Sequence, residues 1–304
     1  MTLEAAEFTR RGLLKRTGAL TVLTASGSLL SACGGDDAKP GESTLAAARR
    51  VGRMRVGFAN EAPYGFANEA GELTGEAPEV ARAVLKELGI KELEGVLTKF
   101  ESLIPGLNAR RFDIIAAGMF ITPERCEQIL FSDPDYVAPE AFAVKKGNPL
   151  GLQDYGSVAD NAEVRLGVLA GAVEGDQAKA AGVGDSQVTR LPDPQSAIEG
   201  LRTGRIDALA LTSISIRRLI ETSGRGEVEL AGPFVPVVDG KEQLGGGGYG
   251  FRKADKELRD AFNQKLDAMK QADALLPIVE PFGFTAEELK PAKQITAADL
   301  CKAA

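Results

Sequence analysis

The 304-residue sequence contains no histidine. This absence excludes Ser-His-Asp and Cys-His nucleophilic sites, histidine-ligated zinc and the commonest general base of enzymes. The sequence also lacks a basic, aromatic-studded stretch of the kind that binds nucleic acid. Beyond its N-terminal segment, no apolar run approaches the ~20 residues that a membrane-spanning helix needs. We therefore expect no nucleic-acid partner, no metal and no cofactor.

The N-terminus has the order of an export signal. The basic segment TRRGLLKR (9–16) precedes 13 uncharged residues, GALTVLTASGSLL, and then small residues. Arg10-Arg11 with the following leucines resembles a twin-arginine signal, and Leu30-Ser31-Ala32-Cys33 resembles a bacterial lipobox. The chain is therefore predicted to be exported and lipid-anchored through Cys33, on the outer face of the cytoplasmic membrane or in the periplasm. The alternative, a transmembrane anchor, is weakened because 13 residues are too few to cross a bilayer.

The predicted mature chain is acidic. Of 36 basic and 43 acidic residues, four basic and two acidic ones precede Cys33, which leaves 32 and 41 and a net charge of −9. That sign also argues against nucleic-acid binding. Residues 33–50 begin as a polar, glycine-containing stretch and are predicted to be a tether. The roughly 255 residues that follow are enough for one large domain or two medium ones.

Strand-like and helix-like segments alternate from residue 51 onward. Strands are predicted in MRVGFAN, VLTKF, DIIAAGMF, EAFAVKKG, VRLGVLAGA, QVTRLPDP, IDALALTS and GGGGYGFRK. Helices are predicted in residues 76–90 and in SLIPGLNARRF, PERCEQILF, VEGDQAKAAG, PQSAIEGLRTGR, SISIRRLIETSG and ELRDAFNQKLDAMKQ. This alternation predicts an α/β fold with mostly parallel sheets covered on both faces.

Two segments share one pattern. SLIPGLNARRFDIIAAGMF and SAIEGLRTGRIDALALTS both contain an apolar helix, a step ending in arginine, an apolar-Asp pair and a buried strand. We interpret them as one structural unit used once in each of two similar lobes.

Four segments carry a family resemblance: ANEAPYGF (59–66), LIPGLNARRFDIIAAGMFITPERC (103–126), SAIEGLRTGRIDALAL (196–211) and VEPFGFTAEEL (279–289). They resemble extracytoplasmic solute-binding proteins of the polar amino-acid type (family 3), and most of all the ectoine- and hydroxyectoine-binding members. The resemblance implies a two-lobed periplasmic-binding-protein fold of type II with two hinge crossings. It also implies a monomer whose partners are a small zwitterionic solute and the permease subunits of an ABC importer.

The resemblance also implies a discontinuous first lobe. The predicted parts are an export signal at 1–32, a tether at 33–50, lobe one at 51–145, lobe two at 146–246 and a lobe-one return segment at 247–304. The crossings are expected near Lys146 and Gly248. Such lobes close by a hinge motion, and Gly245 to Gly248 are expected to supply backbone freedom beside the second crossing.

Phe120 and Arg125 lie where the strand DIIAAGMF gives way to a helix. Ligands of open α/β folds bind at the carboxyl ends of strands, and a guanidinium there can bind a carboxylate through two charge-assisted hydrogen bonds. By resemblance, Arg125 is the carboxylate-binding arginine. The residues alone leave a second interpretation open, in which Arg125 caps its own helix or pairs with Glu124.

Tyr64, Phe100 and Phe120 end strands or follow them, and Glu61 precedes Tyr64 by three residues. Aromatic faces attract a weakly hydrated cation, and a carboxylate accepts hydrogen bonds from amidinium nitrogens. The resemblance assigns these groups to an ectoine-binding cage. In lobe two, the strand IDALALTS ends in Thr212 and Ser213, without the acid that binds the ammonium of α-amino acids in relatives.

The remaining lobe-two contacts are expected from the turn LAGAVEG, where Ala172 and Val173 stand in place of a hydroxyl that many relatives have. The predicted ligand set has eight members: Glu61, Tyr64, Phe100, Phe120, Arg125, Ala172, Val173 and Thr212.

Other functions stay open within and beyond the family. A betaine also suits an aromatic cage, although its quaternary nitrogen has no proton for Glu61, and a polar amino acid is the next alternative. Dehydratases and murein lyases share the fold. Because the chain lacks histidine and no second carboxylate is expected beside Glu61, we predict a binding protein without catalytic residues.

Cys126 and Cys301 are the cysteines left after Cys33. An even count in an exported protein favours a disulfide, and two buried free thiols are the alternative.

Overall fold

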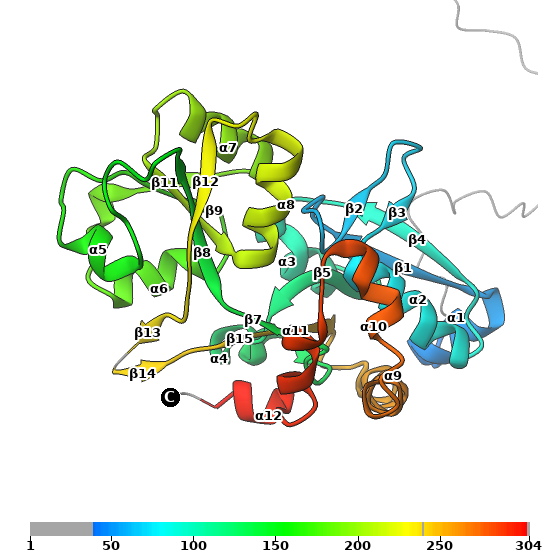
Figure 1. The fold of residues 1–304 in the computed structure, drawn as a ribbon. Helices are drawn as coiled ribbons and strands as arrows, with labels where there is room; N and C mark the ends of the chain where they lie inside the picture. The colour runs from blue at the N-terminus through cyan, green and yellow to red at the C-terminus, as the bar shows by residue number, and fades with distance from the viewer. Residues whose placement is uncertain (1–38, 239, 303–304) are drawn as a thin grey trace, which may run out of the picture. The chain divides into compact units, whose positions relative to one another are not determined.

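Two β-sheets organise the computed structural model, which describes residues 39–238 and 240–302 (Figure 1). The predicted export signal and the predicted lipid-attachment residue Cys33 lie outside the described residues. We call the part built on the six-stranded sheet lobe one and the part built on the five-stranded sheet lobe two. No helix in the described ranges is both long and apolar enough to cross a membrane.

The sheet of lobe one has the order β4-β1-β5-β15-β6, with β7 also paired to β15. Its strands are β1 (Arg53–Phe58), β4 (Glu92–Leu97), β5 (Ile114–Phe120), β6 (Leu130–Phe131), β7 (Tyr136–Ala138) and β15 (Gly245–Phe251). Strand β1 is parallel to β4 and β5, whereas β15 runs antiparallel to β5, β6 and β7. The return segment therefore completes this sheet.

The sheet of lobe two has the order β10-β9-β11-β8-β12. Its strands are β8 (Glu140–Lys145), β9 (Leu166–Leu169), β10 (Val188–Leu191), β11 (Ala208–Thr212) and β12 (Val228–Phe234). Strand β9 is parallel to β10 and β11, and β8 is antiparallel to β11 and β12. The predicted α/β class is confirmed. The expectation of mostly parallel sheets is wrong, because β15 in lobe one and β8 in lobe two are antiparallel to their neighbours.

Both sheets are covered on both faces. Along β5, Ile114 and Ala116 belong to one apolar cluster, while Ile115, Ala117 and Met119 belong to another. The same alternation divides the residues of β11 between two clusters of lobe two. Because successive side chains of a strand point to opposite faces, each sheet has a core on either side.

Helices cover these faces. Lobe one has α1 (Thr44–Val51), α2 (Glu76–Glu87), α3 (Leu103–Asn108), α4 (Pro123–Gln128), α9 (Lys256–Gln271), α10 (Leu276–Val279), α11 (Ala286–Ala292) and α12 (Ala297–Leu300). Lobe two has α5 (Tyr155–Ala159), α6 (Glu174–Ala180), α7 (Pro194–Arg202) and α8 (Ser213–Ser223). The short elements are η1 (Phe100–Ser102), η2 (Asp185–Gln187) and η3 (Glu280–Phe282), and the pairs β2 (Phe66–Ala67) with β3 (Leu73–Thr74) and β13 (Val237–Val238) with β14 (Lys241–Glu242).

The boundaries expected at residues 145 and 146 differ from the observed sheets. Strand β8 pairs only with strands of lobe two, so the chain has already left lobe one between Ala138 and Glu140. Figure 1 shows β8 beside β12, far along the chain. The sequence analysis assigned EAFAVKKG to lobe one because an apolar strand does not reveal its pairing partner.

The predicted tether also ends earlier than residue 50. Helix α1 begins after Ser43, whose side chain accepts a hydrogen bond from the backbone N–H of Ala46, and it buries Leu45, Ala47 and Ala48. Thr44 donates a hydrogen bond to Asp255 at 2.7 Å. The apolar spacing therefore makes residues 44–51 part of lobe one.

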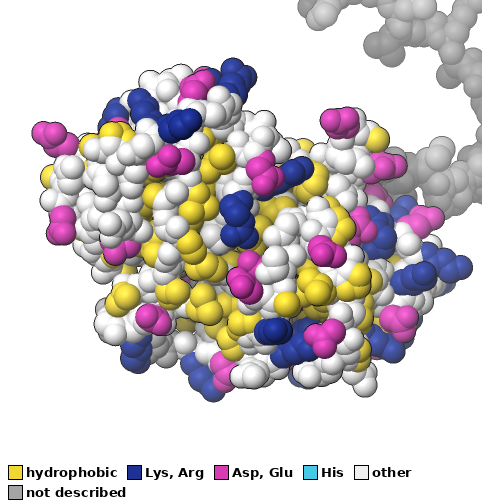
Figure 2. Space-filling view, in the orientation of Figure 1, with side chains coloured by type: hydrophobic (Ala, Val, Ile, Leu, Met, Phe, Trp, Pro, Cys, Tyr) yellow, Lys and Arg dark blue, Asp and Glu magenta, His cyan; other side chains and the backbone are white. Residues whose placement is uncertain are grey.

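Charges of both signs are interspersed over the face shown in Figure 2, and hydrophobic side chains gather toward the middle of that face. This mixed surface agrees with the modest negative charge of the whole chain, −7.

Candidate functional site

Arg125 lies in the first turn of α4, which follows β5. Pro123 begins this helix, and Thr122 caps it by accepting a hydrogen bond from the Arg125 backbone N–H. The residue is only 8% exposed. It donates from Nη1 to the Phe120 carbonyl at 2.6 Å and from Nη2 to the Gly171 carbonyl at 3.0 Å. Arg125 is therefore a buried residue that joins lobe one to lobe two.

Phe100 lies beside this guanidinium. Its ring centroid is 5.5 Å from Arg125 Cζ, which is within cation–π range, and its side chain is half-buried. Burial lowers the pKa of Arg125, and the nearby charges of Glu174 and Asp176 oppose that shift.

Tyr64 and Phe120 are both buried, at 2% and 5% exposed, and belong to one apolar cluster. They meet through Tyr136, which the sequence analysis missed. The Tyr136 ring stacks on Tyr64 with centroids 5.2 Å apart, and its centroid is 6.2 Å from that of Phe120. Its hydroxyl donates to the Gly118 carbonyl at 2.8 Å. Of the three predicted cage rings, two thus share a cluster and Phe100 lies at Arg125.

Glycines make room for these rings. A Cβ on Gly118 would lie 2.3 Å from the Tyr64 ring, one on Gly245 would lie 1.8 Å from Phe120, and one on Gly247 would lie 2.2 Å from Tyr136. Gly245 to Gly248 lie within strand β15. The expectation that these four residues supply backbone freedom beside the second crossing stays a prediction. Within the strand, Gly245 and Gly247 admit aromatic rings closely, whereas Gly246 and Gly248 meet aliphatic and polar neighbours.

Glu61 reaches lobe two. Its Oε1 accepts a hydrogen bond from the Ser215 hydroxyl at 2.8 Å, and it is 9% exposed. Burial raises the pKa of Glu61 to about 7, against the opposing effect of the Ser215 hydrogen bond. The Tyr64 hydroxyl likewise donates to Thr212 Oγ1 at 2.9 Å. The lobes therefore touch through polar contacts made by Glu61, Tyr64 and Arg125, and also through the ion pair of Arg217 with Glu288 at 3.6 Å.

Thr212 is 6% exposed and caps α8, because its hydroxyl oxygen accepts the Ser215 backbone N–H. Ala172 is half-buried against the lobe-two core. Val173 packs against the cluster that contains Tyr64, Phe120 and Tyr136. Thr212 and Val173 therefore lie against the lobe-one part of the predicted site. Ala172 precedes Val173 in the sequence and packs on the core of lobe two instead.

Two buried carboxylates of lobe two escaped the sequence analysis. Glu140 is 1% exposed and lies directly opposite Thr212 in the β8–β11 pair, so both side chains point to the same face of the sheet. Glu174, 4% exposed, is the first residue of α6. The expectation of no second carboxylate near Glu61 is therefore wrong. The only sequence signal was a glutamate that opens an otherwise apolar strand.

These carboxylates influence one another. Burial raises the pKa of Glu140 well above its usual range and that of Glu174 to about 7. The charge of Glu61 raises both pKa values further, and Arg125 opposes the shift at Glu174. Three buried acids thus interact with one another, and of them Glu174 also interacts with the Arg125 guanidinium, which makes the region suited to a ligand that brings a cationic group.

Neither of two surface pockets of the structure is lined by the predicted ligand residues. The pocket of about 230 Å³ adjoins the lobe contact and includes Pro63, Ile214 and Arg217. The predicted residues instead form the buried contact between the lobes.

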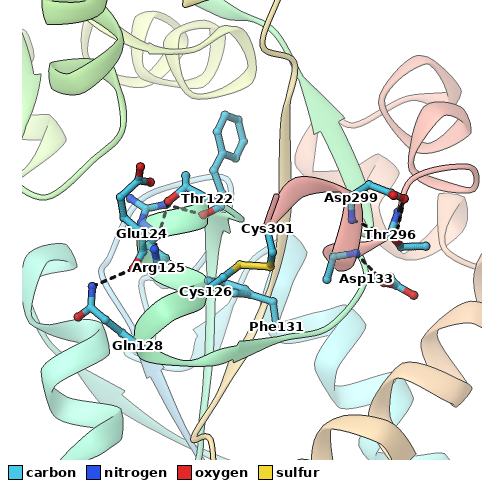
Figure 3. Close-up of a disulfide and its surroundings, with 12 residues drawn as sticks. Thr122, Glu124, Arg125, Cys126, Gln128, Phe131, Asp133, Thr296, Asp299 and Cys301 are labelled. Carbon is cyan, nitrogen blue, oxygen red and sulfur yellow. Dashed lines mark hydrogen bonds between the residues drawn. A yellow bond between two sulfur atoms is a disulfide. The ribbon is translucent and has the colours of Figure 1, made fainter. Parts of the chain in front are cut away.

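The sulfur atoms of Cys126 and Cys301 are joined, with Cα atoms 5.7 Å apart (Figure 3). The bond links α4, next to Arg125, to the end of α12. The Ala297 backbone N–H also donates to Asp133 Oδ1 at 2.7 Å. The C-terminal segment is therefore attached behind the arginine of the site.

Comparisons with known proteins agree with this architecture. Residues 54–285 match the bacterial extracellular solute-binding proteins, family 3. A probable amino-acid ABC transporter periplasmic-binding protein, y4tE of Sinorhizobium fredii, is 37% identical over 264 residues, covering 86% of this chain and 87% of the relative. The L-arginine-binding protein of Pseudomonas aeruginosa is 30% identical over 71% of this chain and 82% of its own. The crystal structure of EhuB in complex with hydroxyectoine is 38% identical with a TM-score of 0.78, covering 86% of this chain and 98% of that chain.

Proposed function

The chain belongs to the bacterial extracellular solute-binding proteins of family 3, and from this premise we propose that its solute is ectoine, hydroxyectoine or a closely similar zwitterion. At the coarser level, it is the extracytoplasmic solute-binding component of an amino-acid-type ABC importer, and a binding protein rather than an enzyme. It delivers its solute to permease subunits in the membrane.

The observation that carries the proposal is the convergence of Glu61, Tyr64 and Arg125 on one contact between the lobes. A solute held there meets an arginine, aromatic rings and a carboxylate together. The relative with a TM-score of 0.78 was crystallised with hydroxyectoine, a zwitterion that has a carboxylate and a delocalised amidinium.

Each end of such a zwitterion has a partner at this contact. Arg125 binds the carboxylate with charge-assisted hydrogen bonds in exchange for one or both of its backbone carbonyl partners. Tyr64, Phe100 and Phe120 present ring faces to the amidinium, at roughly 0.5–2 kcal/mol per face. Glu61 accepts its N–H groups, and Ala172, Val173 and Thr212 close the site from lobe two.

Binding then requires the lobes to separate and close again. In the structure the polar contacts from Tyr64 and Glu61 to lobe two, and from Arg125 to Gly171, hold the lobes together. We propose that entry of the solute breaks these contacts and that closure re-forms them around it, as in other hinge-closing binding proteins. The crossings between the lobes lie at residue 139 and in the segment before β15.

We also propose that the protein is a monomer, exported by a twin-arginine signal and lipid-anchored through Cys33. Metabolic labelling with a radioactive fatty acid tests the anchor: label should enter the wild-type protein, and the Cys33→Ala variant should remain unlabelled.

Isothermal titration calorimetry tests the solute. The mature protein should bind ectoine and hydroxyectoine tightly and glutamate, arginine, proline betaine and glycine betaine weakly. Tighter binding of glutamate or arginine than of ectoine would falsify the assignment.

A polar, cationic amino acid is the second candidate. The buried acids Glu140 and Glu174 favour it, because lobe two does offer carboxylates for a cation. An L-arginine-binding relative is 30% identical to this chain, so arginine belongs in the same calorimetric panel.

A further inference from the structure

Glu76 and Asp135 form a pair of buried carboxyl groups inside lobe one. Glu76 is the first residue of α2 and is 1% exposed, and Asp135, directly before β7, is 2% exposed. Their side chains lie within hydrogen-bonding reach of each other. Two carboxylates that are this close cannot both be ionised without strong repulsion, so the pair shares one proton.

The surroundings assign this proton to Glu76. Its Oε2 is buried and has no partner among the N–H and O–H donors of the described residues, as expected of an oxygen that is itself the donor. Asp135 Oδ2 accepts a hydrogen bond from the Tyr249 hydroxyl at 2.8 Å, and the charge of Lys270 favours the ionised form of Asp135.

The pKa shifts agree with this assignment. Burial raises the pKa of both carboxyl groups. The charge of Asp135 and the hydrogen bond between the two groups raise the pKa of Glu76 further, whereas the same hydrogen bond lowers that of Asp135. The Glu76 carboxyl group therefore donates a hydrogen bond to the Asp135 carboxylate.

This hydrogen bond joins the two segments that carry stacked tyrosines. The backbone N–H of Ala77, next to Glu76, donates to the Tyr64 carbonyl at 3.0 Å. Asp135 directly precedes Tyr136. The rings of Tyr64 and Tyr136 stack with centroids 5.2 Å apart. The pair therefore fixes the spacing of the two backbones from which these rings extend.

Close packing passes a shift of the pair on to the rings. A Cβ on Gly75 would lie 2.4 Å from the Tyr64 carbonyl oxygen, and one on Gly247 would lie 2.2 Å from the Tyr136 ring. Such an interior has little free space into which a displaced ring can move without disturbing its neighbours. The Tyr64 hydroxyl also donates to Thr212 of lobe two, so a displaced Tyr64 ring changes the contact between the lobes.

We propose that Glu76 and Asp135 are positioning residues of the solute site. The carboxyl–carboxylate hydrogen bond between them holds the rings of Tyr64 and Tyr136 in the stacked arrangement that accepts the solute. The inference rests on the proposed function for the role of Tyr64 as a solute contact. Both acids lie outside the predicted ligand set and act through the rings, without touching the solute.

Variants of Glu76 test this hydrogen bond. Glu76→Leu removes the donor but keeps a side chain of similar size, whereas the amide N–H of Glu76→Gln can still donate to Asp135. Calorimetry should show ectoine affinity reduced about tenfold in Glu76→Leu, as expected for loss of one hydrogen bond to a charged group, and within about threefold of the wild type in Glu76→Gln.

Glu79→Leu is the matched control. Glu79 also lies in the first turn of α2, but its carboxylate accepts hydrogen bonds from Thr74 and Arg82. This variant loses hydrogen bonds of the same helix without affecting the acid pair. Its ectoine affinity should stay within about twofold of the wild type.

Near-ultraviolet circular dichroism gives a readout of the rings that does not depend on the solute. The sequence has no tryptophan and four tyrosines. Three of these, Tyr64, Tyr136 and Tyr249, lie around the acid pair. The tyrosine band of the solute-free protein should therefore change in Glu76→Leu and should be retained in Glu76→Gln and Glu79→Leu.

The proposal requires both changes in Glu76→Leu and their rescue in Glu76→Gln. A folded Glu76→Leu variant with wild-type affinity would overturn it, because the pair would then only stabilise the fold. Reduced affinity with an unchanged tyrosine band, or an equal loss of affinity in the leucine and glutamine variants, would also overturn it. Glu76→Asp, which withdraws the donor by one methylene, takes the place of Glu76→Leu if the leucine variant does not fold.

Failure of the solute assignment has a different outcome. If the wild type binds arginine but not ectoine, the proposed function is wrong, and arginine replaces ectoine in the calorimetry. The tyrosine band of the solute-free variants tests the acid pair in either case, because it needs no solute.

Discussion

Helix α3 with strand β5 in lobe one corresponds to helix α7 with strand β11 in lobe two. The strand orders match, β4-β1-β5 and β10-β9-β11. Each unit is also anchored by an equivalent ion pair. Asp113 accepts hydrogen bonds from the backbone and guanidinium of Arg55, as Asp207 does from Arg165.

The two units differ at the helix that follows the strand. Thr122 caps α4 and Thr212 caps α8, each accepting the backbone N–H of the residue three positions later. That residue is Arg125 in lobe one and Ser215 in lobe two. The same backbone arrangement thus positions a buried cation in lobe one and, in lobe two, a hydroxyl that donates a hydrogen bond to Glu61. The comparison shows that the repeated unit sets where a site residue stands, whereas its chemistry is set independently in each lobe.

The residue that follows Arg125 in lobe one also differs from the residue that follows Ser215 in lobe two. This difference gives the largest predicted effect, which is on the free energy of unfolding. Cys126 of α4 is joined to Cys301, whereas Ile216 at the corresponding place in α8 is buried in the lobe-two core. The double variant Cys126→Ser/Cys301→Ser should lose about 4–5 kcal/mol of unfolding free energy, because the bond closes a loop with a sequence separation of 175. Ile216→Val should lose only about 1 kcal/mol.

Chemical denaturation of both variants measures this difference, and thiol counting on the denatured, unreduced mature protein checks the bond itself. Two free thiols would mean that the predicted disulfide does not form and that packing alone holds the C-terminal segment.

The matched positions Arg125 and Ser215 should contribute unequally to binding. Arg125→Ala should reduce solute affinity about 1000-fold, since a desolvated solute carboxylate then lacks its charged partner. Ser215→Ala should cost about three- to tenfold, because it removes one hydrogen bond to Glu61. Calorimetry measures both affinities, with circular dichroism as the control for folding; near-normal affinity of Arg125→Ala would show that the arginine has only a structural role.

The ion pairs of Asp113 and Asp207 should contribute unequally to the free energy of unfolding of the protein. The side chains of Arg55 and Asp113 are each 12% exposed, and Arg252 also binds Asp113 at 3.2 Å. The Arg165 side chain is 48% exposed. Asp113→Asn should therefore cost about 3 kcal/mol, and Asp207→Asn less than about 1 kcal/mol. Equal losses in urea denaturation would show that burial does not separate the two pairs.

The direction of the pH dependence of stability gives a further test of the pair formed by Asp207 and Arg165. The hydrogen bond from Arg165 lowers the pKa of Asp207. Its small contribution should therefore be present above the usual pKa of an aspartate and should be lost as the pH falls through the lowered value.

The smallest effect concerns pH and the acids that the two lobes contribute. Burial raises the pKa of Glu61 and of Glu174 to about 7. The folded protein without solute thus holds protons that the unfolded chain releases near pH 4.5, and its stability should decline as the pH rises from about 4.5 to 7. A bound cation favours the ionised acids, so solute affinity should increase about three- to tenfold from pH 6 to 8.

Calorimetry at pH 6, 7 and 8 follows this increase, and Glu174→Gln should flatten it. An affinity that is constant over this range in the wild type would mean that neither acid changes ionisation when the solute binds.

Much of the fold could be predicted from local patterns. The alternation of apolar strands with helices of 3.6-residue periodicity indicated the elements of both lobes, and the shared pattern around Asp113 and Asp207 indicated the repeat. The threonine–proline step before Arg125 correctly suggested a helix start at the end of a strand. These features depend on neighbours in sequence, because helix caps and strand alternation are local.

The site was less predictable. Phe120 and Arg125 belong to a single motif, so the sequence placed them together. Tyr136, Glu140 and Glu174 each lie in segments with no distinctive spacing, and they join the site only because other strands and the opposite lobe bring them there.

By itself, the sequence determined the α/β class, the repeated unit, the family and the residues Glu61, Tyr64 and Arg125 as candidates for one site. Only the tertiary structure decided that β8 belongs to lobe two, that residues 44–51 pack on lobe one and that Gly245 and Gly247 of β15 admit aromatic rings. It also decided which carboxylates face Glu61. The physical reason is that a strand's partner, a glycine's close neighbour and a buried acid's surroundings are all long-range contacts, which local periodicity does not specify.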